Sequence, residues 1–130
     1  MVKKTILIAG GSGNLGSHLN YYLKDSFETI STYFKNQKYK NKKNYIKLNL
    51  NNKIKTIEIV KKNKINTIIH TSAITDVPYC EKNKNNCYEV NFEQTKSLVD
   101  ICKKQKIKLI YLSTDAVYDN LRNKAPFKES

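Results

Sequence analysis

A glycine-rich segment that directly follows a short apolar run constrains the fold of this chain more than any other feature. Residues 5–16 read Thr-Ile-Leu-Ile-Ala-Gly-Gly-Ser-Gly-Asn-Leu-Gly, and a helical pattern of apolar residues comes next. This order predicts a strand, a tight turn and the N-terminus of a helix. The free N–H groups and the positive dipole end of such a helix favour an anion, so the segment predicts a pyrophosphate site.

The three glycines at the motif's spacing have different expected tasks. Gly10 is expected to allow the turn, Gly13 to let the backbone approach the phosphates, and Gly16 to let the helix pack on the strand. The motif is weak when it stands alone, and a glycine-rich turn without a ligand is the alternative. Its position between a strand and a helix favours dinucleotide binding.

The net charge of +13 raises the question of nucleic-acid binding. Arg122 is the only arginine, and the lysines are spread along the chain among asparagines, as in residues 36–44 and 82–86. A nucleic-acid surface concentrates its charge on one face and interleaves arginine or stacking aromatics. The composition therefore favours a surface of solvated lysines and no specific nucleic-acid partner.

Length and residue content limit the remaining classes. The 130 residues predict one domain, and no apolar run approaches the roughly 18 residues of a membrane span. Cys80, Cys87 and Cys102 lack metal-ligand spacing, so we expect free thiols in a reducing cytoplasm and no metal site. His70 is expected to be a packed, hydrogen-bonded side chain at a strand end, and His18 to lie on a helix surface.

Strand-like and helix-like segments alternate along the chain. This alternation predicts an α/β fold, a Rossmann-type doubly wound parallel sheet covered by helices. Right-handed crossovers give the strand order 3-2-1-4-5, with a ligand crevice beside the C-terminal ends of the first and fourth strands. The expected strands are residues 5–9, 28–34, 45–48, 66–71 and 107–113, and the expected helices begin after residue 13 and cover 53–62 and 86–105.

Four stretches together resemble the extended branch of the short-chain dehydrogenase/reductase superfamily, and more narrowly the dTDP-4-dehydrorhamnose reductase family. Gly10-Gly-Ser-Gly-Asn-Leu-Gly16 resembles the superfamily's glycine motif. The others are His70-Thr-Ser-Ala-Ile-Thr-Asp-Val77 with the following Cys80-Glu81, then Val90-Asn91, and Ser113-Thr-Asp-Ala-Val-Tyr118. Their order and spacing agree with the family over nearly the whole chain.

The resemblance implies a role for each matching residue. Thr114 would hydrogen-bond the substrate carbonyl and stabilise the charge that develops on its oxygen. Asn91 would brace the segment after the fourth strand from its helix. The residues that would contact the cofactor are Gly10, Gly13 and Gly16, the backbone donors of Ser12, Asn14 and Leu15, the small Ser72 and Ala73 under the ribose and nicotinamide, and Ser113.

The end of the second expected strand bears on the choice of nucleotide. NAD-binding proteins place a carboxylate there for the ribose 2′-hydroxyl, but residues 31–36 read Ser-Thr-Tyr-Phe-Lys-Asn. Lys35 is able to pair with a 2′-phosphate, with Thr32 or Lys38 assisting and Tyr33 beside it, so NADP(H) is favoured over NAD(H). Asn49, after the third strand, is a candidate for the adenine edge.

The family's Tyr-x-x-x-Lys motif, which supplies the proton and the ribose-binding lysine, does not occur at the expected place. Tyr39 and Lys43 have the spacing but lie in the loop after the second strand, while Tyr118 and Arg122 lack the lysine. We therefore interpret residues 1–130 as a cofactor-binding portion that is inactive alone. The sixth strand and the substrate domain are expected beyond Ser130.

The resemblance implies a protein that reduces a 4-keto sugar on a nucleoside diphosphate with NAD(P)H, for polysaccharide synthesis. A sugar-nucleotide epimerase or dehydratase of the same superfamily is one alternative. A non-catalytic nucleotide-binding module similar to the regulatory beta subunit of methionine adenosyltransferase is another. A downstream tyrosine and lysine, and turnover of a keto-sugar nucleotide, distinguish these possibilities.

Overall fold

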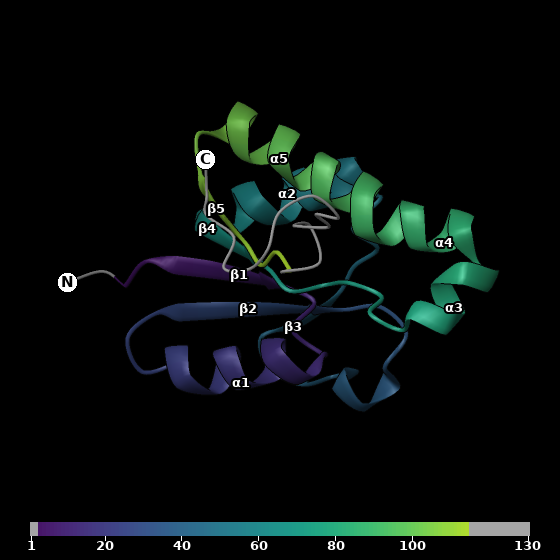
Figure 1. Cartoon of the computed structure of the whole chain (residues 1–130). Coiled ribbons are helices and arrows are strands. Elements are labelled where there is room, and N and C mark those ends of the chain that lie inside the picture. The colour runs from purple at the N-terminus through teal and green to yellow at the C-terminus, as the bar shows by residue number, and fades with distance from the viewer. Residues whose placement is uncertain (1–2, 115–130) are drawn as a thin grey trace, which may run out of the picture.

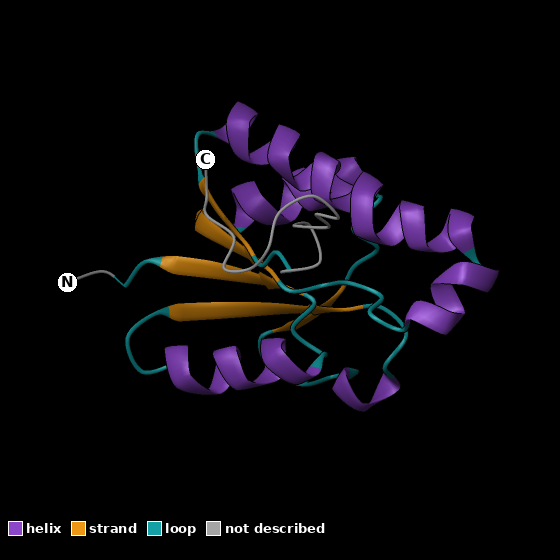
Figure 2. Cartoon of the chain, in the orientation of Figure 1, coloured by secondary structure: helices purple, strands orange, loops and turns teal. Residues whose placement is uncertain are grey.

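The structure is a computed structural model that describes residues 3–114 (Figure 2). Predictions that involve Asp115, Tyr118 or Arg122 fall outside these residues. The strands are β1 (Thr5–Ala9), β2 (Glu28–Tyr33), β3 (Tyr45–Lys47), β4 (Ile65–His70) and β5 (Lys108–Tyr111). The helices are α1 (Asn14–Leu23), the 3₁₀ turn η1 (Gln37–Tyr39), α2 (Lys53–Lys62), α3 (Val77–Lys82), α4 (Lys84–Tyr88), the π-helical segment η2 (Glu89–Glu93) and α5 (Gln94–Gln105).

The five strands form one parallel sheet in the predicted order β3-β2-β1-β4-β5. The central strand β1 pairs on one side with β2 and on the other with β4, so Leu7 stands between Ile30 and Ile68. Each connection is a crossover through a helix or loop, because parallel neighbours cannot be joined by a tight turn. The C-terminal ends of β1 and β4, where the chain order reverses, therefore meet at one edge.

Helices cover both faces of the sheet, as expected for a doubly wound fold (Figure 1). Alternate residues of β1 point to opposite faces, which sends Leu7 toward α2 and α5 and sends Ile8 toward α1. The larger core lies on the α2–α5 face and includes the fully buried Ile68 and Leu98. The smaller core lies under α1, where Leu19, Leu23 and Phe27 cover Ile6, Ile8 and Ile69.

The region after β4 differs from the prediction. In place of one helix over residues 86–105, the structure has a helical run from Lys84 to Gln105 that is interrupted by the π segment η2. The additional short helix α3 precedes this run. Helix α3 begins where the Asp76 side chain accepts a hydrogen bond from the Tyr79 N–H at 2.9 Å, with Pro78 in the first turn. Both are ordinary helix-start signals, which a reading based on apolar periodicity alone overlooks.

The prediction of three free thiols is wrong for two of the cysteines. Cys80 on α3 and Cys87 on α4 form a disulfide, because the chain turns at Asn83 and brings their Cα atoms to 5.6 Å. Cys102 is free and buried, and burial raises its pKa to about 11. A count of cysteines could not reveal this pair because the turn between the two helices creates it.

Two observations concern membranes and metals. Over residues 3–114, no helix combines the length and apolar character needed to span a bilayer. The same residues hold no cluster of three or more metal-ligating side chains from histidine, cysteine, aspartate and glutamate.

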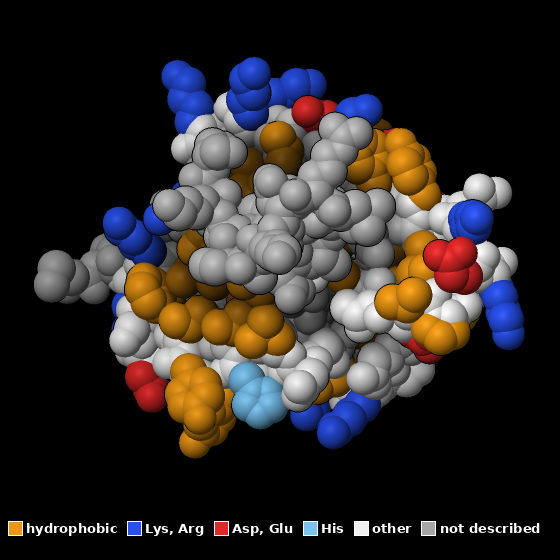
Figure 3. All heavy atoms as spheres, viewed as in Figure 1, with side chains coloured by type: hydrophobic (Ala, Val, Ile, Leu, Met, Phe, Trp, Pro, Cys, Tyr) orange, Lys and Arg blue, Asp and Glu red, His pale blue; other side chains and the backbone are white. Residues whose placement is uncertain are grey.

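On the face drawn in Figure 3, lysine side chains lie around the rim of the molecule and not in one patch.

Candidate functional site

A cleft of about 480 Å³ opens at the C-terminal edge of the sheet, where the crevice was predicted. Its walls come from the glycine turn after β1, the ends of β2 and β3, the loop after β4 and one side of the helical run from α4 to α5. The lining residues are Gly10, Ser12, Gly13, Thr32, Tyr33, Phe34, Lys35, Asn36, Leu48, Asn49, Leu50, Asn51, Ser72, Ala73, Ile74, Asn86, Glu89, Val90 and Gln94.

The glycine turn is held tightly against the strands beside it. Gly10 has φ +92°, and a Cβ there would lie 2.7 Å from the Ser72 backbone nitrogen. The Gly10 N–H donates to the Thr32 hydroxyl at 3.0 Å, which ties the turn to β2. A Cβ on the buried Gly16 would lie 2.3 Å from the Gly10 carbonyl oxygen. The predicted backbone roles of Gly10 in the turn and Gly16 in helix packing are confirmed.

The N-terminus of α1 follows this turn without a side-chain cap. Gly13 is the N-cap residue, and the first backbone bond of the helix runs from the Ser17 N–H to the Gly13 carbonyl at 3.0 Å. The N–H groups of Asn14, Leu15 and Gly16 therefore precede the helical ladder. The Ser12 N–H instead donates to the Thr32 carbonyl at 3.2 Å, so this expected phosphate donor is engaged within the turn.

The end of β2 forms the wall expected to contact the ribose. Tyr33, Phe34 and Lys35 line the cleft, and Lys35 is exposed. Thr32 also lines the cleft, is only 2% exposed, and accepts the Gly10 N–H on its hydroxyl oxygen. Lys38 lies on η1 and does not contribute to the lining of this cleft.

The segment after β3 joins the opposite wall through hydrogen bonds. The Asn49 side-chain oxygen accepts from the Asn51 N–H at 3.0 Å. The Asn51 amide in turn donates to the Glu89 carboxylate at 2.5 Å, which links the two sides of the cleft. Among the described lining residues, Lys35 is the one basic and Glu89 the one acidic side chain.

Asn91 braces the loop after β4, as predicted. Its side-chain oxygen accepts from the Ile74 N–H at 2.8 Å, and its amide donates to the Ile74 carbonyl at 2.9 Å. The Asn91 backbone carbonyl accepts from the Thr95 hydroxyl at 2.8 Å. These bonds connect the π-helical segment to a residue that lines the cleft.

His70 is packed and hydrogen-bonded, as expected, and is 1% exposed. Its Nε2 lies 3.0 Å from the Thr95 hydroxyl oxygen. Because the Thr95 proton is directed to the Asn91 carbonyl, Nε2 must carry the imidazole proton. Burial lowers the pKa of His70. His18 is exposed on α1, as predicted.

The structure brings together most, but not all, of the predicted cofactor contacts. Gly10, Ser12, Gly13, Tyr33, Lys35, Asn49, Ser72 and Ala73 line the cleft, whereas Asn14, Leu15, Gly16, Ser113 and Thr114 lie outside its lining. Sequence reasoning missed Asn51, Asn86, Glu89 and Gln94. Of these four, only Gln94 had a signal in the sequence: it lies four residues after Val90, and this spacing places the two side chains on one side of a helix.

Comparisons with known proteins agree with this geometry. The uncharacterised protein MJ1055 of Methanocaldococcus jannaschii is 30% identical over 147 aligned positions, which cover 99% of this chain and 45% of that protein. The crystal structure of a hypothetical dTDP-4-dehydrorhamnose reductase from Sulfolobus tokodaii is 28% identical, with a TM-score of 0.81. That match covers 97% of this chain and 45% of the other. The chain thus spans less than half the length of these relatives.

A more distant match shows the fold alone. The structure of UDP-glucose 4-epimerase from Brucella ovis in complex with NAD is 21% identical, with a TM-score of 0.80 over 90% of this chain and 38% of that one.

A family model for the RmlD substrate binding domain matches residues 4–130. This match spans nearly the whole chain, so the chain belongs to the RmlD substrate binding domain family.

Proposed function

We propose that residues 1–130 are the dinucleotide-binding domain of a protein that uses NADP(H) to reduce a 4-keto sugar on a nucleoside diphosphate. The cleft at the C-terminal edge of the sheet is the observation that carries this proposal. It has the glycine turn and the open α1 N-terminus on one side and small residues, Ser72 and Ala73, on the other. Family membership supports the same class of reaction.

The preference for NADP(H) rests on charge at the end of β2. Among residues 3–114, no carboxylate lines this wall to bind the ribose 2′-hydroxyl, whereas the exposed Lys35 is available to a 2′-phosphate. We propose that Gly13 lets the phosphates approach the backbone and that the N–H groups of Asn14 and Leu15 receive them. Asn49, held by the Asn51 N–H, is proposed to contact adenine through its amide.

Titration of the chain with NADPH and NADH, followed by the fluorescence of the reduced nicotinamide, tests cofactor binding. We expect NADPH to bind about tenfold more tightly, because one charge-assisted phosphate contact contributes on the order of 1.5 kcal/mol. Lys35→Ala is expected to abolish this difference, while the matched variant Lys38→Ala keeps it. Equal affinity of the unmodified chain for both nucleotides would overturn the NADP(H) assignment.

Thr114 and Ser113 follow β5, the strand beside β4. We propose that Thr114 hydrogen-bonds the keto oxygen and that Ser113 contacts the cofactor. This role is tested in an extended protein, one that carries the proposed substrate domain after residue 130, by measuring NADPH consumption with a dTDP-4-keto-6-deoxy sugar. Thr114→Val is expected to lower kcat about 100-fold with little change in the NADPH affinity. If the extended protein binds NADPH but consumes none with any keto-sugar nucleotide, an epimerase or a regulatory module replaces the reductase.

A further inference from the structure

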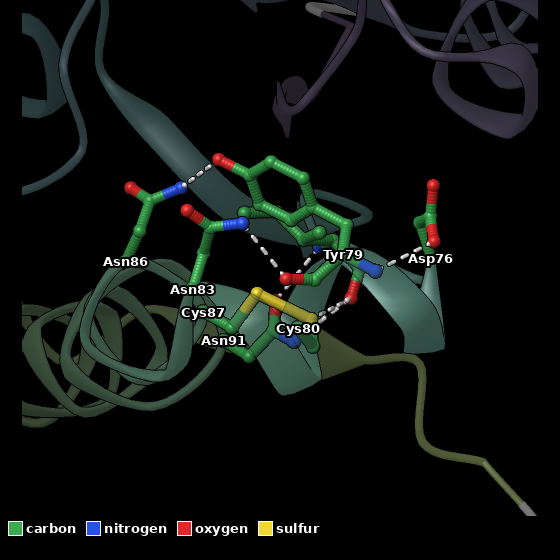
Figure 4. Close-up of a disulfide and its surroundings, with 8 residues drawn as sticks. Asp76, Tyr79, Cys80, Asn83, Asn86, Cys87 and Asn91 are labelled. Carbon is green, nitrogen blue, oxygen red and sulfur yellow. Dashed lines mark hydrogen bonds between the residues drawn. A yellow bond between two sulfur atoms is a disulfide. The ribbon is translucent and has the colours of Figure 1, made fainter.

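Helix α3 is attached to the rest of the molecule mainly through polar contacts and one disulfide. None of its residues is buried, so apolar packing contributes little to its position. The Tyr79 hydroxyl accepts from the Asn86 amide at 3.0 Å, and the Tyr79 carbonyl accepts from the Asn83 amide at 3.0 Å (Figure 4). Beyond the main chain through Asn83, the Cys80–Cys87 disulfide joins α3 to α4 (Figure 4).

Both ends of this disulfide lie next to residues that line the cleft. Cys87 directly follows Asn86, and its side chain is buried with 7% exposure. The Cys80 sulfur lies 3.8 Å from the Ile74 carbonyl oxygen, the same oxygen that accepts the Asn91 amide. The disulfide therefore holds α3 beside two residues that line the cleft: the Cys80 sulfur contacts Ile74, and Tyr79 of the same helix bonds Asn86.

We propose that Cys80 and Cys87 are a thiol–disulfide exchange site whose oxidation state controls the order of α3 and of the cleft wall beside it. The substrate class is a dithiol reductant. Its thiolate attacks the sulfur of Cys80, a half-buried residue, and the buried Cys87 leaves as a thiolate. The second thiolate of the reductant then attacks the reductant's own sulfur in the mixed disulfide and releases the Cys80 thiolate.

The exchange is balanced in electrons and protons. Two electrons pass from the dithiol, which becomes a disulfide, to the protein disulfide, which becomes two thiols. The two protons released by the reductant are taken up by Cys80 and Cys87. Once the bond is broken, α3 keeps only its polar contacts and has no buried side chain, so we expect it to open locally.

The oxidation state is tested first by counting thiols on the unfolded protein. Protein equilibrated with an oxidised dithiol is expected to show one thiol, that of Cys102, and protein treated with reduced dithiothreitol to show three. Trypsin cleavage after Lys82 is expected to be about tenfold faster in the reduced protein, because α3 opens. Three thiols after oxidation, or equal cleavage rates in both states, would overturn the proposal.

Variants separate this pair from the third cysteine. Cys80→Ser is expected to be cleaved rapidly with or without dithiothreitol. Cys102→Ser removes the buried thiol that takes no part in the bond and is expected to keep the full redox response. A Cys80→Ser protein that is cleaved as slowly as the oxidised protein would contradict a role for the disulfide in holding α3.

The effect on the cleft rests on the proposed function and has its own measurement. Reduction is expected to weaken NADPH binding about threefold to tenfold, because opening of α3 removes the Tyr79–Asn86 hydrogen bond and the Cys80 contact with Ile74. If NADPH binds neither state, the proposed cofactor is wrong, while the thiol count and the cleavage rates still judge the exchange site. If NADPH binds both states equally, the coupling between the disulfide and the cleft is refuted.

Discussion

The two hydrogen bonds between Asn91 and the backbone of Ile74 offer a direct test of how the cleft wall is held. They join η2 to the loop after β4 at 2.8 Å and 2.9 Å. Asn91→Ala removes both bonds, each worth about 1 kcal/mol, and leaves a half-buried N–H and carbonyl without partners. We therefore expect the free energy of unfolding to fall by about 2–4 kcal/mol.

Urea denaturation followed by circular dichroism measures this loss, and thermal melting provides a second estimate. For a domain of this size the melting temperature is expected to fall by roughly 8–16 °C, since each kcal/mol shifts it by about 4 °C. Asn85→Ala is the matched control, because Asn85 is exposed on α4 and no hydrogen bond of its side chain is seen among residues 3–114.

A third variant separates the two bonds. Asn91→Asp retains the oxygen that accepts from the Ile74 N–H but directs a second oxygen at the Ile74 carbonyl. It is expected to lose at least as much stability at pH 7 as Asn91→Ala. If Asn91→Ala unfolds within 0.5 kcal/mol of the Asn85→Ala control, an approximate limit for surface substitutions, the bracing argument is refuted.

Three other predictions follow from single positions. Gly16→Ala is expected to cost about 2–3 kcal/mol in urea denaturation, because its Cβ would lie 2.3 Å from the Gly10 carbonyl oxygen; a loss below 0.5 kcal/mol, a rough limit for surface changes, would contradict this contact. Burial lowers the pKa of His70 below its ordinary 6.5, so the unfolded protein binds a proton more readily than the folded protein. The contribution of the neutral His70 to the free energy of unfolding is expected to be fully present above pH 6.5 and to fall by up to about 1.4 kcal/mol per pH unit as the pH decreases toward the folded-state pKa. His70→Gln should lack this dependence, and an unchanged slope would refute the assignment. Lys106→Gly is expected to stabilise the protein by about 0.5–1 kcal/mol, because Lys106 ends α5 at φ +53°, whereas Lys104→Gly within the helix should destabilise it by a similar amount; equal signs would contradict the left-handed cap.

Local signals in the sequence were sufficient for the sheet and for one side of the cleft. The apolar run before Gly10 predicts β1, and the periodicity of residues 53–62 predicts α2 with the bounds that the structure has. The strand order follows from the alternation of elements and from the handedness of crossovers. The glycine turn, Lys35 and Asn91 were found because motifs mark their positions in the chain.

Contacts between distant segments were beyond such reasoning. The Asn51–Glu89 hydrogen bond joins residues 38 positions apart, and neither residue belongs to a motif. The hydrogen bond from the Gly10 N–H to the Thr32 hydroxyl oxygen likewise joins residues 22 positions apart.

The parallel sheet, the glycine turn and the edge at which the cleft opens can be predicted from residues 1–130 alone, because they depend on apolar periodicity, on glycine positions and on the order of elements along the chain. The side chains that complete the cleft and the pairing of Cys80 with Cys87 become visible in the folded structure. Those features depend on how α3 and α4 turn at Asn83 and pack beside the loop after β4. Distances between atoms of different elements, which no local pattern encodes, set them.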